Sequence, residues 1–357
     1  MNWSKKVNAW LLPASVLYGM AVRLRNYLFD QGILKEHTFG CPIICIGNLS
    51  VGGTGKTPHT EYLISLLRDK YRTAVLSRGY KRKTRGFLLA GPDSTADQIG
   101  DEPWQMHDKY PDVRVAVCAQ RVRGIQALLA QANAPQAILL DDAYQHRYVK
   151  AGLNILLIDY NQLQGDMHLL PAGRLREPFS EMRRADIVIV TKCPPDMNPI
   201  DYRIATNRLS VSANQHLFFS DIRYEHPRKV FQQEVIPIDQ LRKSPVLLLT
   251  GIANPRPMER YLRERCGEMR VMAFGDHHRF TRQDIAAINH TYSTMPSDSY
   301  VVTTQKDAAR LRYADGLDAS LWEHLLELPI KIHILRGSDL QFNNIILNYV
   351  RKNTRNN

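Results

Sequence analysis

A glycine-rich loop that ends in a lysine and a threonine carries the clearest chemistry in this sequence. The apolar residues 43–46 lead into Gly52-Gly53-Thr54-Gly55-Lys56-Thr57-Pro58, and residues 59–68 have the pattern of an amphipathic helix. Glycines let backbone N–H groups converge on phosphate, and the dipole of the following helix favours an anion. The lysine can reach β- and γ-phosphate oxygens, and the threonine hydroxyl can ligate Mg²⁺. We therefore expect a nucleoside triphosphate site.

One position departs from the strict pattern of such loops. Glycine is expected six residues before the lysine, and Ser50 stands there. The alternative interpretation is a glycine-rich turn that precedes a lysine by chance, but the strand, loop and helix context favours the phosphate site. The expected nucleotide-binding residues are Asn48, Ser50, Val51, Gly52, Gly53, Thr54, Gly55, Lys56, Thr57 and Pro58.

Two adjacent carboxylates follow another apolar run. Residues 137–140 end in Asp141 and Asp142. At the end of a strand in a nucleotide-binding sheet, such acids hold Mg²⁺ directly or through water, together with the threonine of the loop. A strand-terminal aspartate can also simply cap the next helix. Two consecutive aspartates in a chain with a phosphate loop favour the metal site, formed by Thr57, Asp141 and Asp142.

A second acidic pair, Asp101-Glu102, precedes Pro103. Asp101 could be the N-cap of a helix, because aspartate followed by proline in the first turn is a common helix start. It could equally face the γ-phosphate and accept a proton from a substrate hydroxyl. The local pattern leaves both open.

A histidine doublet, His277-His278, lies in a loop after a predicted strand. Histidine can orient or assist a catalytic base near neutral pH. A solvated polar loop is equally compatible with this stretch. Metal binding by both residues is disfavoured because neighbouring side chains diverge.

Basic residues gather near three predicted strand ends, in residues 77–83, at Arg121 and Arg123, and in residues 173–178. Ligands bind at such ends in α/β sheets, and arginine suits bidentate phosphate contacts. Solvated loop charge is the alternative for any single cluster. Three clusters, with a net charge of +12 from 47 basic and 35 acidic residues, favour an anionic substrate or an acidic membrane face. Nucleic acid would also suit the positive charge, but the sequence has no recognised nucleic-acid motif or basic patch with interleaved aromatic residues, and we expect no nucleic-acid partner.

The N-terminal segment has the character of a membrane-interface helix. Residues 7–22 are uncharged, with two lysines before them and two arginines after them. The segment is too short to span a bilayer, Pro13 interrupts it, and no cleavage site of a secretory signal follows. Apolar and aromatic residues with basic flanks suit a helix that lies in the interface. The alternative is a helix packed on the protein's own core.

The remaining chain alternates strand-like runs with helix-like segments. The runs are residues 43–46, 74–77, 114–118, 137–140, 155–158 and 187–190, and then 246–250, 271–274, 300–303 and 332–335. Such alternation predicts a mostly parallel, doubly wound α/β sheet with ligands at the strands' carboxyl ends. We expect an interface helix (1–30), a P-loop NTPase-like domain (31–218), a linker or β-ribbon (219–244) and a smaller α/β domain (245–357), meeting at a cleft. Five scattered cysteines without zinc spacing fit a reducing compartment.

Taken together, the motifs resemble the tetraacyldisaccharide 4'-kinase (lipid A 4'-kinase) family of Gram-negative bacteria. The resemblance covers nearly the whole chain. It rests on Gly47-Asn48, residues 52–58 (GGTGKTP), 77–80 (SRGY), 100–103 (GDEP), 140–147 (LDDAYQHR), 170–178 (LPAGRLREP), 276–278 (DHH) and 303–307 (TTQKD). Ala143-Tyr144 stands where the family usually has Gly-Phe, a change that leaves both carboxylates in place.

The resemblance implies an ATP- and Mg²⁺-dependent phosphotransferase that phosphorylates the 4'-hydroxyl of a lipid A disaccharide 1-phosphate. It also implies a peripheral enzyme on the cytoplasmic face of the inner membrane, in contact with an anionic lipid surface, and we expect a monomer. Asp101 and a histidine would form the acid/base pair, with His277 assigned first and His278 second, and Lys56 would serve the triphosphate. Arg78, Tyr80, Glu102, Arg121, Arg176 and Glu177 would shape the substrate and phosphate cleft.

Two other functions would keep the same nucleotide site. A soluble P-loop kinase of another phosphorylated metabolite would have no use for the N-terminal segment. A membrane-associated nucleotide switch would use it, but ATPases of the deviant-loop type carry a lysine where Val51 stands. GTPase-type switches carry an Asn-Lys-x-Asp motif that residues 191–194 (TKCP) do not supply.

Overall fold

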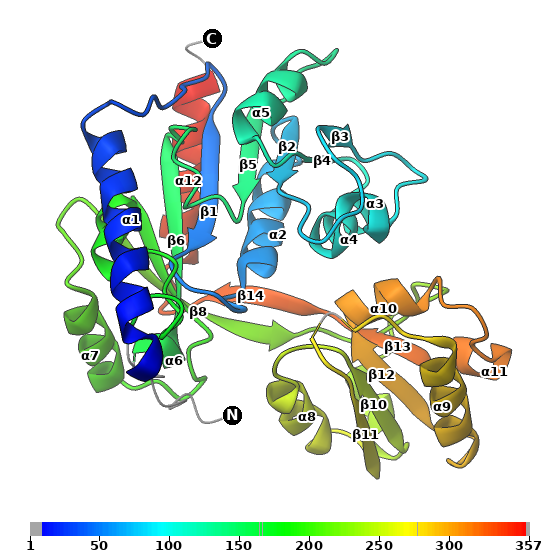
Figure 1. The fold of residues 1–357 in the computed structure, drawn as a ribbon. Helices are drawn as coiled ribbons and strands as arrows, with labels where there is room; N and C mark the ends of the chain where they lie inside the picture. The colour runs from blue at the N-terminus through cyan, green and yellow to red at the C-terminus, as the bar shows by residue number, and fades with distance from the viewer. Residues whose placement is uncertain (1–8, 164, 166, 277, 355–357) are drawn as a thin grey trace. The chain divides into compact units, whose positions relative to one another are not determined.

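The computed structural model describes residues 9–163, 165, 167–276 and 278–354. Its compact units are a larger one, residues 2–222 and 332–357, and a smaller one, residues 223–331. Figure 1 shows the chain as a ribbon, coloured along the sequence. The parallel, doubly wound α/β architecture expected from the sequence is present in the larger unit, and the smaller unit is a second α/β fold.

The larger sheet has the strand order β14-β8-β7-β6-β1-β5-β2-β4-β3 among the described residues. From β8 to β4 all neighbours pair in parallel, and β3 pairs antiparallel with β4. The strands are β1 (Ile43–Asn48), β2 (Thr73–Ser77), β3 (Leu88–Leu89), β4 (Arg114–Val117), β5 (Ala137–Asp141), β6 (Leu153–Asp159), β7 (Ile187–Thr191), β8 (His216–Tyr224) and β14 (Ile330–Ile334). Strand β1 therefore lies centrally, between β5 and β6.

Helices cover both faces of this sheet. They are α1 (Leu12–Asp30), preceded by a 3₁₀ turn (Ala9–Leu11), α2 (Lys56–Leu67), α3 (Ala96–Ile99), α4 (Asp101–Lys109), α5 (Arg121–Leu129), α6 (Tyr160–Leu163), α7 (Pro199–Leu209) and α12 (Asp339–Thr354), with a 3₁₀ helix at Phe179–Arg184. Residues of α2 and α12 share one buried cluster with alternate residues of the central strands, while α5 and α7 belong to clusters formed by the intervening strand residues. This alternation follows from the two-residue period of a strand.

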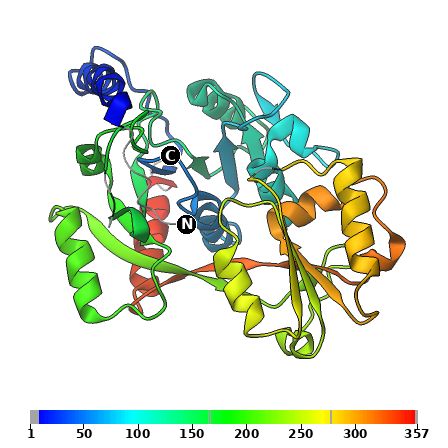
Figure 2. The same ribbon diagram turned by 60° about the horizontal axis from the view of Figure 1, so that its bottom comes forward.

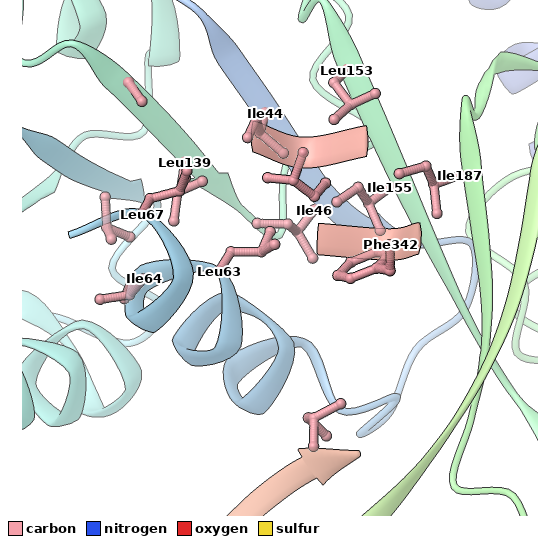
Figure 3. Packing of buried hydrophobic residues seen from close by; sticks show 14 of the residues in the cluster. Ile44, Ile46, Leu63, Ile64, Leu67, Leu139, Leu153, Ile155, Ile187 and Phe342 are labelled. Atoms are coloured by element: carbon pink, nitrogen blue, oxygen red, sulfur yellow. The ribbon is translucent and has the colours of Figure 1, made fainter. Parts of the chain in front are cut away.

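The side chains of one face show how the central strand is held. Ile44 and Ile46 of β1 are fully buried and belong to one cluster with Leu63 of α2 and Phe342 of α12 (Figure 3). Because Gly47 and Asn48 end this strand at the phosphate loop, the packing fixes the position from which the loop starts.

The smaller unit has its own sheet, of order β11-β10-β12-β13-β9, parallel except for β9. Its elements are β9 (Arg228–Lys229), a 3₁₀ helix (Ile238–Arg242), β10 (Val246–Thr250), α8 (Arg256–Arg263), β11 (Met269–Ala273), α9 (Arg282–Ser293), β12 (Tyr300–Thr304), α10 (Gln305–Leu311), α11 (Ala319–Trp322) and β13 (Leu325–Leu328). Helix α8 covers one face, and α9, α10 and α11 cover the other (Figure 2).

The unit boundaries differ from those expected from the sequence. The C-terminal segment was expected in the smaller domain, yet β14 pairs in the larger sheet and α12 is buried against its central strands. The segment expected as a linker contributes β8 to the larger sheet and β9 to the smaller one. The physical reason is burial: Phe342, Ile346 and Val350 of α12 cover apolar residues of the larger sheet, a contact that local pattern cannot reveal.

Helix α1 runs through the proline expected to interrupt it, because Pro13 lies in the first turn, where its missing N–H costs nothing. None of the described helices is long and apolar enough to cross a bilayer.

Candidate active site

The loop between β1 and α2 has a backbone that requires glycine at two positions. Gly52 has φ of 114° and Gly55 has φ of 86°, in the region where residues with a Cβ are strained. A Cβ on Gly52 would also lie 2.7 Å from the guanidinium of Arg174. Helix α2 begins at Lys56 directly after the loop, so the unpaired N–H groups and positive dipole end of this helix are available to an anion.

Ser50, the departure from the strict loop pattern, has a structural explanation. Its side chain is buried, and its hydroxyl lies 3.0 Å from Oε1 of Gln162 on α6. The next residue, Val51, donates its backbone N–H to the carbonyl of Arg174 at 2.8 Å. The Ser50 hydroxyl therefore ties the first half of the loop to α6, and the backbone of Val51 ties it to the segment of Arg174.

His59 and Asn48 hold the second half of the loop. Nδ2 of Asn48 donates to Oγ1 of Thr54 at 2.9 Å. Nδ1 of His59 lies 2.7 Å from the carbonyl of Gly55, which can only accept, so Nδ1 carries the proton and Nε2 accepts from the hydroxyl of Ser220 at 3.0 Å. Burial lowers the pKa of His59 to about 4. The imidazole is therefore neutral at neutral pH and bridges the loop to β8.

Asp142 lies between two cations. Lys56 Nζ is 3.6 Å from its Oδ1, and an Nη of Arg176 is 3.2 Å from the same oxygen. The backbone N–H of Arg176 also donates to the carbonyl of Leu49 at 2.7 Å. The structure thus brings together the loop lysine, the second aspartate of the pair at the end of β5 and an arginine of residues 173–178.

Asp141 points into the interior instead. Its carboxylate accepts from the hydroxyls of Thr60 at 3.1 Å and Ser77 at 3.3 Å. Burial, together with the negative charges of Asp142 and Glu102, raises the pKa of Asp141 to about 6. Glu102 is therefore close enough to affect the protonation of Asp141, so the two acidic pairs found in the sequence interact electrostatically.

The oxygen donors present fit Mg²⁺. Thr57, Asp141 and Asp142 supply a hydroxyl and two carboxylates, and Mg²⁺ commonly takes one or two carboxylates together with phosphate oxygens and water. No group of three or more His, Cys, Asp or Glu that could hold a metal occurs among the described residues. The hydroxyl of Thr57 and the two carboxylates suit a Mg²⁺ ion that binds together with a nucleotide.

Asp101 lies in the first turn of α4, and Gly100 is the N-cap of this helix. Gly100 has φ of 96°, and a Cβ there would lie 3.1 Å from the carbonyl oxygen of Tyr80. The loop that contains Arg78 and Tyr80 therefore packs against the start of α4, and two separate sequence motifs meet at this point.

The basic residues differ in accessibility. Arg121, the first residue of α5, is buried and donates to the carbonyls of Cys118 at 3.0 Å and Ala119 at 3.3 Å, while its Nε has no hydrogen-bond partner within the described residues. Burial lowers the pKa of Arg121, opposed by Asp141 and Asp142. Arg78 and Tyr80 are exposed.

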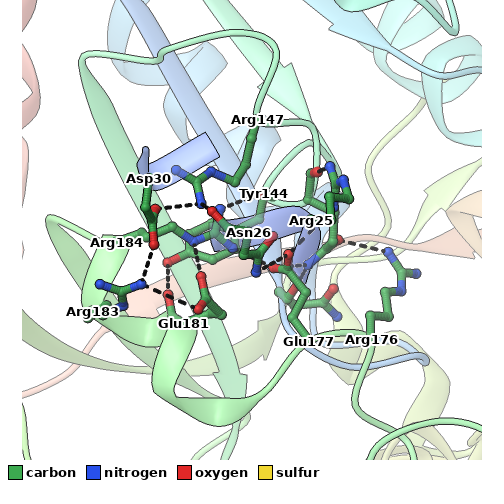
Figure 4. Close-up of polar contacts among 12 residues, drawn as sticks. Arg25, Asn26, Asp30, Tyr144, Arg147, Arg176, Glu177, Glu181, Arg183 and Arg184 are labelled. Atoms are coloured by element: carbon green, nitrogen blue, oxygen red, sulfur yellow. Dashed lines mark hydrogen bonds and ion pairs between the residues drawn. The ribbon is translucent and has the colours of Figure 1, made fainter. Parts of the chain in front are cut away.

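Glu177 was expected in the substrate cleft, and the structure places it in the interior. Its carboxylate is 1% exposed and pairs with Arg184, with Nδ2 of Asn26 at 3.2 Å and with Nε2 of Gln145 at 3.4 Å (Figure 4). Arg25 lies 3.8 Å away. Glu177 thus holds α1 against the segment that presents Arg176, and this role needs contacts across 151 residues that the sequence pattern does not show.

The histidine doublet belongs to the smaller unit. His277 lies outside the described residues. His278 Nε2 is 2.9 Å from Oδ2 of Asp284, and the ring stacks on Phe274 with a centroid distance of 4.7 Å. The hydrogen bonds from Thr281 and then His278 lower the pKa of Asp284 to about 2. His278 is therefore engaged within its own unit.

Sequence reasoning missed the end of β7 as part of the loop's support. Thr191 Oγ1 donates to the carbonyl of Thr54 at 2.9 Å, and Lys192 Nζ donates to the carbonyl of Gly53. The available signal was the position of these two residues directly after the apolar run 187–190.

Comparisons with known proteins identify the same family. A family model described as tetraacyldisaccharide-1-P 4'-kinase matches residues 7–351. The chain is 50% identical over 362 residues to the tetraacyldisaccharide 4'-kinase of Bacteroides thetaiotaomicron, covering 98% of this chain and 95% of that protein. It is 51% identical over 361 residues to the enzyme of that name from Bacteroides fragilis, covering 99% and 96%.

A solved structure gives the same result for the fold. The crystal structure of LpxK from Aquifex aeolicus in complex with ATP superposes with a TM-score of 0.77 at 30% sequence identity, covering 96% of this chain and 99% of that chain.

Proposed function

The chain belongs to the tetraacyldisaccharide-1-P 4'-kinase family, and from this premise we propose how its residues carry out the reaction. It is an ATP- and Mg²⁺-dependent kinase of lipid A biosynthesis that phosphorylates the 4'-hydroxyl of the tetraacyl disaccharide 1-phosphate. The observation that carries the assignment of its site is Asp142, which lies beside the glycine loop between Lys56 and Arg176.

The loop residues 48–58 bind the triphosphate of ATP. The first N–H groups of α2 face the phosphates, and Lys56 leaves Asp142 to contact the β- and γ-phosphates when ATP is bound. Arg176 then remains as the cation on Asp142. Mg²⁺ held by Thr57, Asp141 and Asp142 would neutralise charge on the β- and γ-phosphates. The residues of this chain thus supply positioning and charge, which are the main contributions to phosphoryl transfer.

Asp101 acts as the general base that takes the proton of the 4'-hydroxyl, and His277 assists it. Asp101 is supported by its place at the first turn of α4 beside the loop of Arg78 and Tyr80. His277 is preferred within the doublet because His278 is already bonded to Asp284 and stacked on Phe274. Base catalysis by a positioned carboxylate contributes about 10²–10⁴ in rate.

Arginines near the phosphate loop orient the anionic acceptor. Arg78 is exposed in the loop that packs against the start of α4, and Arg121 is buried with one guanidinium N–H unpartnered among the described residues. We assign Arg78, Tyr80 and Arg121 to the acceptor, with Glu102 beside them. Glu177 serves indirectly by holding the backbone next to Arg176.

Helix α1 rests on the surface of an anionic membrane. Its buried residues are Ser15, Gly19, Asn26 and Phe29. Ser15 is bonded to the carbonyl of Leu169 at 3.1 Å and Asn26 to Glu177, and Phe29 near the end of the helix packs on Tyr148. Its outward side chains are apolar: Trp10, in the turn before it, is 92% exposed, Leu17 is 65% exposed and Leu24 is 60% exposed. A helix that turns its apolar side away from its own protein suits burial at the headgroup boundary.

The acceptor is itself an amphiphile, so this contact places the kinase where its substrate resides. We assign the protein to the cytoplasmic face of the bacterial inner membrane, where anionic lipids attract basic residues at about 1 kcal/mol each. It works as a peripheral monomer.

The test is transfer of label from γ-labelled ATP to the purified disaccharide 1-phosphate in detergent. We expect a doubly phosphorylated lipid from the wild type and none from Lys56→Ala, because the γ-phosphate loses its nearest cation. Lys70→Ala, an exposed lysine just after α2, is the matched control and should transfer normally. ATP hydrolysis without a labelled lipid would favour a nucleotide switch, and transfer by Lys56→Ala would exclude the loop assignment.

A further inference from the structure

A lysine outside the phosphate loop is tied to it. Lys192 follows β7, and its Nζ donates to the carbonyl of Gly53 and to Oδ2 of Asp159, the latter at 3.0 Å. Asp159 is buried at the end of β6, and it also caps the next turn by accepting from the N–H of Asn161. The catalytic scheme above uses neither Lys192 nor Asp159.

The strand order decides which part of a bound nucleotide reaches Lys192. Lys56 pairs with Asp142, which follows β5, so the γ-phosphate end of ATP points to the β5 side of β1. Strand β6 lies on the other side of β1, and β7 follows it. The α-phosphate and the nucleoside must therefore extend over the carboxyl ends of β6 and β7. Two strand spacings, about 10 Å, separate β1 from β7.

The conformation and exposure of Lys192 allow its side chain to contact a ligand at the carboxyl end of β7. It has φ of 55°, a left-handed conformation that turns the chain at the end of β7. Its ammonium is fixed by Asp159 and by Gly53, yet one third of the side chain, 33%, is exposed. When the ammonium group of a lysine is held by hydrogen bonds, its methylene groups form an apolar surface. The ammonium group itself also attracts an aromatic ring that lies near it.

We propose that the side chain of Lys192 supports the adenine base of bound ATP, with Asp159 holding it in place. This inference rests on the proposed placement of the triphosphate, with its γ end toward Asp142. It adds a nucleoside-binding residue to a site otherwise defined by phosphate contacts.

The rival explanation is that Lys192 only clamps the phosphate loop. Thr191 provides a control for a clamp, because its hydroxyl donates to the carbonyl of Thr54 while the residue is fully buried and cannot touch a ligand. Loss of a clamp weakens binding of any triphosphate. Loss of a base contact weakens only ligands that carry a base.

The experiment measures dissociation constants of Mg²⁺-ATP and Mg²⁺-tripolyphosphate by calorimetry. We compare the wild type with Lys192→Ala, Lys192→Met and Thr191→Val, each checked for folding by circular dichroism. Lys192→Ala should weaken ATP about fivefold more than tripolyphosphate, the size of a contact between a cationic side chain and an aromatic ring. Lys192→Met keeps a long stem and should lose less of this difference. Thr191→Val should affect both ligands equally.

Equal losses of both ligands in Lys192→Ala, or no loss of either, would overturn the proposal and leave Lys192 as a clamp. Lys56→Ala separates this result from a failure of the nucleotide site, since it should weaken both ligands strongly. If the wild type binds neither ligand, the phosphate site itself is wrong, and the inference that rests on it falls too.

Discussion

At the residue scale, one carboxylate of the site interacts with two cationic side chains. Asp142 contacts both Lys56 and Arg176. Asp141, the preceding residue, is buried and accepts hydrogen bonds from two hydroxyl groups. Strand β5 ends at Asp141, and Asp142 has φ of 47°, so the chain turns between the two aspartates and their side chains meet different surroundings. Asp142 is therefore the carboxylate beside the cations of the phosphate loop, while Thr60 and Ser77 orient Asp141, the other proposed Mg²⁺ ligand.

The proposed base gives the first prediction. Asp101→Asn should lower kcat by about 10²–10⁴ while ATP binding persists. His277→Ala should also lower kcat, and the double variant should lose little more, because residues that act as a unit are not additive. The measurement is kcat for both singles and the double, with calorimetric ATP binding alongside.

The controls for this cycle come from carboxylates and histidines elsewhere. Asp112→Asn removes a surface carboxylate that pairs with Arg68 at 3.1 Å and should leave kcat unchanged. His278→Ala should lower the stability of the smaller unit more than it lowers kcat, because it breaks the bond to Asp284. Multiplicative losses in the double variant would show that Asp101 and His277 act independently.

His146 gives a prediction on pH. Burial, together with the charges of Arg121, Arg25 and Arg78, lowers the pKa of His146 to about 4, against about 6.5 for an exposed histidine. Between these values the unfolded chain binds a proton that the folded chain does not, so stability falls as the pH drops from about 7 to 4. His146→Gln removes this loss.

The melting temperature should therefore decrease less between pH 8 and pH 5 in His146→Gln than in the wild type. The comparison uses thermal unfolding in the absence of nucleotide. His290→Gln, an exposed histidine on α9, is the control and should keep the dependence of the wild type. Identical slopes in all three proteins would mean that His146 titrates normally in the folded state.

At the element scale, α1 joins two surfaces of opposite character. Its inner side makes specific polar contacts: the hydroxyl of Tyr18 donates to the carbonyl of Arg176 at 2.7 Å, and Arg25 donates to the carbonyl of Gln145 at 2.5 Å. Deleting the helix would therefore leave Glu177 buried without its partner Asn26, and would destabilise the unit as well as remove a membrane contact. Substitution on the outer side separates the two effects.

We expect Leu17→Ser, Met20→Ser and Leu24→Ser, made together, to reduce binding to anionic liposomes by at least about 100-fold, because each apolar side chain contributes about 1.5–3 kcal/mol when buried. Ile200→Ser with Ile204→Ser, two exposed apolar residues of α7, is the matched control. Liposome flotation gives the measurement, with transfer to detergent-dispersed lipid as a check on folding. Unchanged flotation of the triple variant would place the anchor elsewhere.

At the scale of the whole molecule, the chain leaves its larger unit within β8 and returns to it within β14. The C-terminal helix α12 then completes the face of the sheet that also carries α2. The phosphate loop starts from β1, whose residues on this face pack against both helices. The last segment of the chain therefore supports the first functional motif.

Phe342→Ala tests this dependence. A fully enclosed phenylalanine typically contributes 3–5 kcal/mol, so the substitution should destabilise the larger unit by about that much. Mg²⁺-ATP stabilises the unit that binds it, so the affected unfolding transition should be the one that nucleotide shifts upward. Leu340→Ala, 71% exposed on the same helix, should change neither transition. If Phe342→Ala instead lowered the melting temperature of the transition that nucleotide does not shift, α12 would belong to the smaller unit.

The sequence by itself determined the elements and the site motifs that depend on local pattern. Continuous apolar runs predicted the parallel strands, and the glycines before Lys56 predicted the loop, because a left-handed backbone at Gly52 and Gly55 leaves little choice of residue. The carboxylates after β5 were predictable because ligands gather at the carboxyl ends of parallel strands.

Only the tertiary structure decided how distant segments complete these motifs. Ser50 meets Gln162 across 112 residues, and Asn26 meets Glu177 across 151. The same holds for α12, whose apolar side would have suited either sheet. Periodicity tells which side of an element is buried but not against what. A side chain's partner is chosen by packing in three dimensions, so the enclosure of Glu177 and the outward apolar side of α1 became visible only in the fold.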